Sequence, residues 1–249
     1  MREQGFIMDD GIRLSTVLER PREGRCPLVI FLHGFTSTKD RPHNVASCEA
    51  MREAGFATLR MDLYGHGESG GTFAKHTLYK WISNTMAAID RARSFGWAEE
   101  IWLSGHSQGG LTAALAAAME PDHVRGLILR APAFMIPACA RTGKMLGCCF
   151  DPEAVPDEVK VIKGLTLEGT YIRVAQTIRA EDAMDRFRGP VLILHGDEDD
   201  TVPAEDSAAA AGRYANAHLE IIRGETHHFD RHPEQMKAII RDWLKHVRE

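Results

Sequence analysis

The sequence predicts an α/β fold with a mostly parallel central sheet. Its 249 residues and 44% apolar content are enough for one large domain with a full core. Short apolar runs alternate with longer segments of helical periodicity, which implies parallel strands joined by right-handed crossovers. Polar or glycine-rich turns follow several of these runs. In such sheets the reacting groups gather at the carboxyl ends of the strands, so these turns form the candidate site.

The elements of the predicted core can be assigned in chain order. Residues 6–8 and 12–18 flank Asp9-Asp10-Gly11 and predict an antiparallel hairpin. After it, apolar runs predict buried strands and 3.6-residue periodicity predicts helices, with Gly55 and Pro233 as end and start signals. We expect strands at residues 28–32, 56–61, 101–103, 124–129, 191–194 and 219–222, and helices at 45–54, 76–93, 111–119 and 233–247.

Residues 132–183 interrupt this alternation, because no good strand pattern occurs among them. A structureless loop of that length is improbable inside a compact domain, and half of the segment is apolar. We therefore expect residues 1–131 and 184–249 to form the core, and residues 132–183 to form an inserted lid of short helices or a small hairpin over the active site. The alternative is a structural decoration away from the chemistry.

The most informative motif is Gly105-His106-Ser107-Gln108-Gly109, between a predicted strand and an alanine-rich predicted helix. A serine on so sharp a strand-to-helix turn has its Oγ lifted clear of the backbone. The glycines are needed because a Cβ there would collide with the neighbouring strand and helix. The helix N-terminus behind the serine offers free N–H groups to a developing oxyanion. The motif predicts Ser107 as a catalytic nucleophile.

A serine hydroxyl becomes a good nucleophile only when a base removes its proton, and the base needs an orienting carboxylate. On this type of elbow the chain order is serine, acid, histidine. Four carboxylates lie in the turn after the strand at 191–194. The spacing G-x-x-D-x-x-V-P favours Asp199 as the acid. Asp197 is the alternative, although it could instead bond N–H groups within the turn.

The base is expected after the last strand, where His227, His228 and His232 follow a short turn. Neighbours in an extended segment point to opposite sides, so only one of His227 and His228 can face the serine. We predict His227 as the base and keep His228 as the alternative. His232 precedes Pro233 and is expected to be exposed at the start of the last helix.

An oxyanion hole needs two backbone N–H donors. One is expected from Gln108, the residue after the nucleophile, and the other from the loop after the strand at 28–32. That loop reads His33-Gly34-Phe35-Thr36. Phe35 N–H is therefore the expected second donor, and Gly34 lets the backbone approach the site closely.

The segment Gly65-His66-Gly67-Glu68-Ser69-Gly70 matches the G-x-G-x-x-G pattern and follows a strand. A dinucleotide site also requires the helix to start within the motif, whereas residues 71–75 intervene before any predicted helix. We therefore expect a structural loop that borders the active site, with His33 and His66 as structural histidines. No cofactor is expected.

Composition excludes several other classes of function. A formal net charge of −5 provides no basic surface for nucleic acid or an anionic membrane. No apolar run reaches the length of a membrane span, and the N-terminus has no apolar signal core. The five cysteines show no C-x-x-C spacing, so we expect reduced thiols in the cytoplasm and no metal site.

With these motifs in this order, the chain resembles the α/β-hydrolases over nearly its whole length. The segments that carry the resemblance are His33-Gly34-Phe35-Thr36, Asp62-x-x-Gly65-His66-Gly67-x-Ser69, Gly105 to Gly110, the Asp199 turn and Thr226-His227. Within that superfamily the chain is most similar to the bacterial cinnamoyl (feruloyl) esterases. Phe35, Gln108, the insertion and residues 167–176 fit that group, in which a tyrosine at the place of Tyr171 helps hold the phenolic ring of the acyl group.

The resemblance implies a serine carboxylesterase that acts through an acyl-enzyme on aryl, cinnamoyl or short-chain esters. Its expected partner is a small-molecule ester, and a homodimer remains open. The group tends to carry an acidic side chain early in the insertion, whereas residues 136–140 contain none. Alternatives on the same fold are a lipase or monoacylglycerol-type hydrolase, a thioesterase or a peptidase. A ligand-binding module without catalysis is the remaining alternative.

Overall fold

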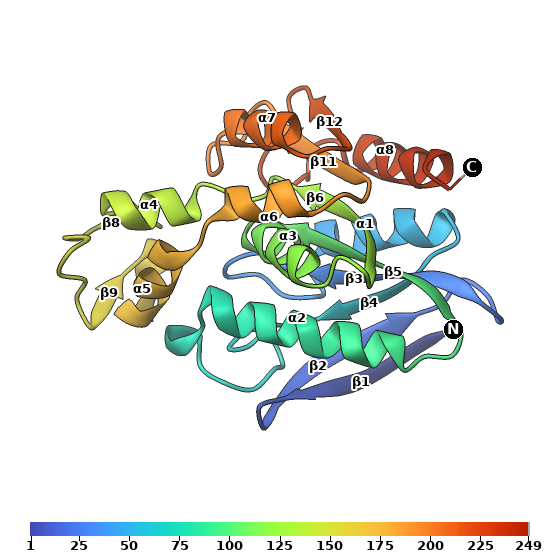
Figure 1. Cartoon of the computed structure of the whole chain (residues 1–249), viewed down its shortest axis with the longest axis horizontal. Helices are drawn as coiled ribbons and strands as arrows, with labels where there is room; N and C mark the ends of the chain where they lie inside the picture. The colour runs from blue at the N-terminus through green and yellow to red at the C-terminus, as the bar shows by residue number, and fades with distance from the viewer. Residues whose placement is uncertain (249) are drawn as a thin grey trace.

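A mixed sheet of eight strands runs through the molecule, in the order β1-β2-β4-β3-β5-β6-β11-β12 (Figure 1). The computed structural model describes residues 1–248. Strand β2 pairs antiparallel with both β1 and β4, and the other neighbours pair in parallel. The strands are β1 (Arg2–Asp9), β2 (Ile12–Glu19), β3 (Cys26–Leu32), β4 (Ala57–Met61), β5 (Ala98–His106), β6 (Val124–Arg130), β11 (Val191–Gly196) and β12 (Ala217–Ile222).

Helices cover both faces of the sheet because the central strands are apolar on both sides. Val29 and Phe31 of β3 pack into a cluster with side chains of α1 (Pro42–Glu53) and α8 (Pro233–His246). Ile30, one residue along, belongs to the cluster on the opposite face. That face is covered by α2 (Leu78–Arg93), α3 (Gln108–Met119) and α6 (Ala180–Arg186), which pack against one another in the order α2, α3, α6.

The predicted insertion is a group of short elements that project from one end of the sheet, at the left of Figure 1. Strands β7 and β8 form a small antiparallel hairpin, and β9 pairs antiparallel with β10. Helix α6 crosses the expected boundary at residue 183 and packs on α3 of the core. The elements are α4 (Ile136–Thr142), β7 (Lys144–Met145), β8 (Cys148–Cys149), β9 (Glu158–Lys160), η2 (Ile162–Gly164), β10 (Thr166–Glu168) and α5 (Gly169–Thr177).

The predicted α/β fold class with its mostly parallel sheet is confirmed. One core helix was not predicted, α7 (Ala204–Arg213). Half of its residues are alanine and none is a large apolar residue, so it lacks the spaced large apolar side chains by which the other helices were predicted. The first helix also begins earlier than expected, at Pro42, since proline is favoured at the first helical position. None of the helices within residues 1–248 combines the length and apolarity that a membrane span requires.

Candidate active site

Ser107 lies on a strained turn between β5 and α3. Its backbone angles are φ 55° and ψ −122°, a left-handed conformation that a residue with a side chain rarely adopts. The flanking glycines make the turn possible. A Cβ at Gly105 would overlap the backbone of Gly109, and one at Gly109 would overlap the carbonyl oxygens of Leu32 and His33. Strand, turn and helix therefore meet too closely for a side chain at position 105 or 109.

The structure brings Asp199 and His227 together. The Nδ1 atom of His227 lies 2.7 Å from Asp199 Oδ2. The Asp199 side chain has no exposed surface, and its Oδ1 accepts hydrogen bonds from the backbone N–H groups of Thr201 and Val202 at 2.9 Å each. Burial alone would raise the pKa of Asp199, but hydrogen bonds from His195 and His227 outweigh it and hold that pKa below its usual value.

A second histidine, His195, supports the same carboxylate. Its Nε2 lies 3.0 Å from Asp199 Oδ2 and 3.0 Å from the carbonyl oxygen of Val202. A carbonyl only accepts, so Nε2 carries the proton and Nδ1 accepts from the Ser207 hydroxyl at 2.7 Å. His195 is completely buried at the end of β11. Asp199 is thus held by four donors, and the acid of the pair is fixed in place.

The alternative acid and base lie elsewhere. Asp197 is exposed, and its Oδ1 accepts from the Gly224 N–H at 2.6 Å, which ties two turns together. His228 is exposed and stacks on His43. His232 is exposed at the start of α8, as expected. His227 and Ser107 line one cavity. Within residues 1–248 their side chains share no hydrogen bond, and in unliganded sites such bonds often tighten only with substrate present.

The two expected oxyanion donors, Phe35 and Gln108, line the same cavity as Ser107. Gln108 is the first residue of α3, where N–H groups have no partner within the helix. Gly34 packs directly on the elbow, since a Cβ at this position would lie 3.0 Å from Ser107 Cβ. The loop after β3 therefore reaches the nucleophile with its backbone.

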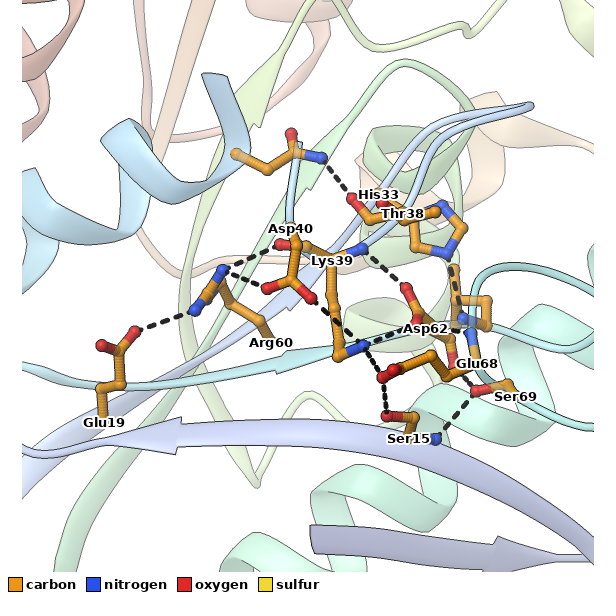
Figure 2. Close-up of polar contacts among 12 residues, drawn as sticks. Ser15, Glu19, His33, Thr38, Lys39, Asp40, Arg60, Asp62, Glu68 and Ser69 are labelled. Atoms are coloured by element: carbon orange, nitrogen blue, oxygen red, sulfur yellow. Dashed lines mark hydrogen bonds and ion pairs between the residues drawn. The ribbon is translucent and has the colours of Figure 1, made fainter. Parts of the chain in front are cut away.

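A buried ion pair anchors the loop that carries Phe35 (Figure 2). Lys39 Nζ lies 2.8 Å from Asp62 Oδ2, and both side chains are almost completely buried. The Lys39 N–H also donates to Asp62 Oδ1 at 2.7 Å. Glu68 of the glycine-rich loop adds a second carboxylate at 2.6 Å from Lys39 Nζ. The pair thus joins the loop after β3 to the end of β4.

Further contacts in Figure 2 fix the start and end of the same loop. The Leu63 N–H donates to His33 Nε2 at 3.0 Å, and His33 Nδ1 donates to the Gly34 carbonyl at 2.8 Å, so the ring is a neutral imidazole. Burial is the main cause that lowers the pKa of His33 to about 3. Arg60 donates to the Lys39 carbonyl and pairs with Asp40, both at 3.0 Å. These contacts hold the loop after β3 at both of its ends.

Tyr171 lies behind the cavity rather than on its surface. It is completely buried, and its hydroxyl donates to Gln108 Oε1 at 2.7 Å. Burial raises the pKa of this phenol above its usual value. Gln108 Nε2 is buried and has no hydrogen-bond partner within the described residues. Tyr171 therefore reaches the site through the Gln108 side chain in this structure.

Sequence reasoning missed three supporting residues: His195, His106 and Lys39. His106 Nε2 donates to the carbonyl oxygen of His227 at 2.7 Å and so holds the loop that carries His227. His106 and His195 lie at the ends of β5 and β11, and that position was the available signal, whereas Lys39 lies within the loop after β3 and had none. Lys39 and His106 contact residues 23 and 121 positions away in the sequence, and His195 contacts Asp199 across a turn. Such pairings depend on the tertiary fold, so sequence spacing does not reveal them.

The cavity at the elbow has a volume of about 190 Å³. Its polar lining includes Ser107, His227 and Lys163, together with Thr201, His228 and polar residues of the loop at 34–37. Its apolar lining comes mostly from the insertion, with Val202 from the acid turn. The insertion residues that line it are Ala133, Met135, Ile136, Leu146 and Ile162. The arrangement suits attack by a serine on an acyl carbon whose small apolar substituent lies under the insertion.

Comparison with protein families shows which family the chain is related to. The sequence pattern of serine aminopeptidase S33, a family of hydrolases, matches residues 25–151, about half of the chain. The chain belongs to the serine aminopeptidase S33 family. This membership confirms the predicted α/β-hydrolase fold, and the matched residues include the loop after β3 and the elbow at Ser107.

Three proteins similar to this S33 member illustrate the range of its relatives. The solved structure of Est1E from Butyrivibrio proteoclasticus with ferulic acid bound is 46% identical, with a TM-score of 0.96 and 98% of each chain covered. Monoacylglycerol lipase of Mycolicibacterium smegmatis is 23% identical over 97% of this chain and 96% of its own. The human mitochondrial palmitoyl-protein thioesterase ABHD10 is 27% identical over 84% of this chain and 69% of its own. The predicted similarity to serine esterases of feruloyl type is confirmed by the Est1E match.

Proposed function

We propose that this hydrolase is a serine carboxylesterase for small aryl or cinnamoyl esters, with Ser107, His227 and Asp199 as its catalytic triad. The observation that carries the proposal is the buried Asp199–His227 pair, which shares one small cavity with a serine on a strained elbow. The match to Est1E, whose solved structure holds ferulic acid, supports the acyl group that we assign.

The geometry assigns each step to a residue. His227 Nε2 takes the Ser107 proton as Oγ attacks the ester carbonyl, while Asp199 holds the tautomer with the proton on Nδ1. The N–H groups of Phe35 and Gln108 bind the oxyanion of the tetrahedral intermediate. His227 then protonates the leaving alcohol, and an acyl-enzyme remains on Ser107. Water activated by His227 releases the acid and restores the serine.

We propose that residues 132–183 act as a lid that forms the acyl pocket. Side chains of this segment supply most of the apolar lining of the cavity, which supports a role in binding rather than decoration. A volume of about 190 Å³ lies below the roughly 300–1,000 Å³ of sites that bind drug-sized ligands. The size favours a short or single-ring acyl group over a long lipid chain.

A panel of esters tests the assignment. We expect turnover of feruloyl and short-chain aryl esters, and weaker turnover of long-chain monoacylglycerols, acyl thioesters and anilides. The Ser107→Ala variant should lose turnover by at least about 10³-fold. Ser83→Ala, on the exposed side of α2, is the matched control and should retain it. Greater activity on long-chain esters or thioesters than on aryl esters would contradict the proposed substrate class.

A further inference from the structure

Three histidines that the proposed reaction does not use meet beside the catalytic base. His43 lies in the first turn of α1, His106 ends β5, and His228 follows His227. One ring nitrogen of each lies within 4.8 Å of those of the other two. The three come from distant parts of the chain, so their spacing in the sequence does not predict that they lie together.

Two of these rings hold a nitrogen with no partner. His106 Nε2 lies 2.7 Å from the His227 carbonyl oxygen, which can only accept, so Nε2 carries the proton and Nδ1 keeps a free lone pair. His106 is only 2% exposed, and its Nδ1 has no hydrogen-bond partner within residues 1–248. His43 Nε2 is likewise buried and unpartnered there. Most buried polar atoms have a partner, which can be an ordered water or a bound ion.

The spacing of the rings is close to that of a metal site. The ring centroids are 5.1 Å apart for His43 and His106, 5.6 Å for His43 and His228, and 6.1 Å for His106 and His228. Three imidazoles around one tetrahedral ion, with metal–nitrogen bonds of about 2.0–2.1 Å, have centroids roughly 5 to 5.5 Å apart. His228 is exposed and can move to close the difference.

We propose that His43, His106 and His228 bind one divalent transition-metal ion of the zinc, copper or nickel class. Imidazole nitrogens suit these metals, and the set contains no carboxylate that would favour calcium or magnesium. The hydrogen bond from His106 to a backbone carbonyl is the contact that commonly orients a metal-binding histidine. His43 and His228 also line a cavity of about 480 Å³, which gives an ion access to the cluster.

The charges around the cluster limit its affinity. Arg130 is completely buried and donates to the His43 carbonyl oxygen at 3.3 Å, and Lys163 lines the same cavity. Asp230, another lining residue, is the one carboxylate there. The cationic neighbours oppose a divalent ion, so we expect micromolar rather than tighter binding.

Metal binding should slow the esterase reaction. His106 holds the carbonyl of His227, and His228 is its neighbour in sequence. An ion bound by both would restrain the loop that carries the base. The metal site is therefore an inhibitory site outside the triad. Binding itself does not depend on the proposed function, and it can be measured without any substrate.

Titration of the purified protein with Co²⁺ tests the site directly. We expect the visible absorption of four-coordinate Co²⁺ to saturate at one equivalent. His43→Ala and His228→Ala should each weaken binding at least about tenfold. His218→Ala should leave it unchanged, because His218 is an exposed histidine on β12 paired with Glu220. Circular dichroism would confirm that the variants fold.

The outcomes distinguish the three-histidine site from metal binding at the proposed base, His227. Absence of the Co²⁺ bands, or binding as tight in both cluster variants as in the wild type, would overturn the proposal. Loss of binding in His227→Asn but not in His43→Ala would place the ion on the proposed base, and would overturn it too. In the ester assay, the Zn²⁺ concentration that halves the rate should rise at least about tenfold in His43→Ala. An unchanged value would refute the inhibitory role.

Discussion

At the residue scale, the elbow depends on the absence of a Cβ at Gly105 and Gly109. Ser107 reaches its left-handed conformation because Gly105 and Gly109 let strand, turn and helix approach one another. The sequence predicted this requirement from the motif alone, since the reason is steric and local. It could not predict His195 as a support of Asp199, because that contact depends on the path of the turn between them.

A pair of glycine substitutions tests the steric argument. Gly105→Ala would place a Cβ into the backbone of Gly109, so we expect a loss of activity together with a free energy of unfolding lowered by about 1–3 kcal/mol. Gly212→Ala, in α7, meets nothing within 4 Å and should leave stability unchanged or raise it by up to about 1 kcal/mol. Urea denaturation of both variants measures the difference, and similar values for the two would contradict the account.

At the element scale, a buried ion pair helps to hold the loop after β3, beside the apolar contacts of Phe35. Lys39, Asp62 and Glu68 join it to β4 and to the glycine-rich loop. The sequence placed Phe35 in the oxyanion hole by motif, but the buried lysine was not predicted. Composition and spacing do not show which of many lysines is buried.

Lys39→Met should reveal the contribution of that ion pair. The substitution leaves the buried Asp62 carboxylate without its cation, which costs about 3–5 kcal/mol of stability. Turnover should also fall, because the Phe35 N–H loses its anchor. Lys75→Met is the control, since Lys75 pairs with Glu168 at 3.9 Å on the surface and such pairs contribute about 0–1 kcal/mol. A loss below about 1 kcal/mol for Lys39→Met would refute the anchoring role.

Tyr171 allows a test of whether the insertion contributes to substrate selectivity. Its hydroxyl now donates to Gln108 Oε1, and we propose that it exchanges this partner for the phenolic oxygen of a feruloyl group. Tyr171→Phe should then raise KM for a feruloyl ester several-fold more than for an acetyl ester, as steady-state kinetics would show. Equal losses on both esters would mean that Tyr171 only positions Gln108.

At the scale of the whole molecule, the order of strands and helices was readable from the sequence because each element carries its own periodicity. The core strands lie where the apolar runs predicted them. The insertion was predicted from the absence of such a pattern, and its short strands could not be assigned for the same reason. The alanine-rich helix α7 was missed because it contains no large apolar side chain that would mark a buried face.

Several buried histidines make the stability of the whole chain depend on pH. Burial is the main cause that lowers the pKa of both His33 and His76 to about 3. The unfolded chain therefore binds more protons than the folded one below about pH 6.5, and stability falls as pH is lowered through that region. We expect a free energy of unfolding at least about 2 kcal/mol lower at pH 5 than at pH 7.

Urea denaturation at the two pH values checks this expectation. The exposed variant His218→Asn should show the same pH dependence as the wild type, because His218 lies on the surface. Equal free energies of unfolding at pH 5 and pH 7 would mean that the buried imidazoles gain protons in the folded chain as readily as in the unfolded one.

The central claim is that Ser107, activated by the buried His227–Asp199 pair, is the nucleophile of an esterase. The most direct test is mass spectrometry of the protein after reaction with a fluorophosphonate. We expect a single covalent adduct on Ser107 in the wild type, formation at least about 10²-fold slower in His227→Ala, and none in Ser107→Ala. Labelling of another serine, or unchanged labelling in Ser107→Ala, would contradict the account.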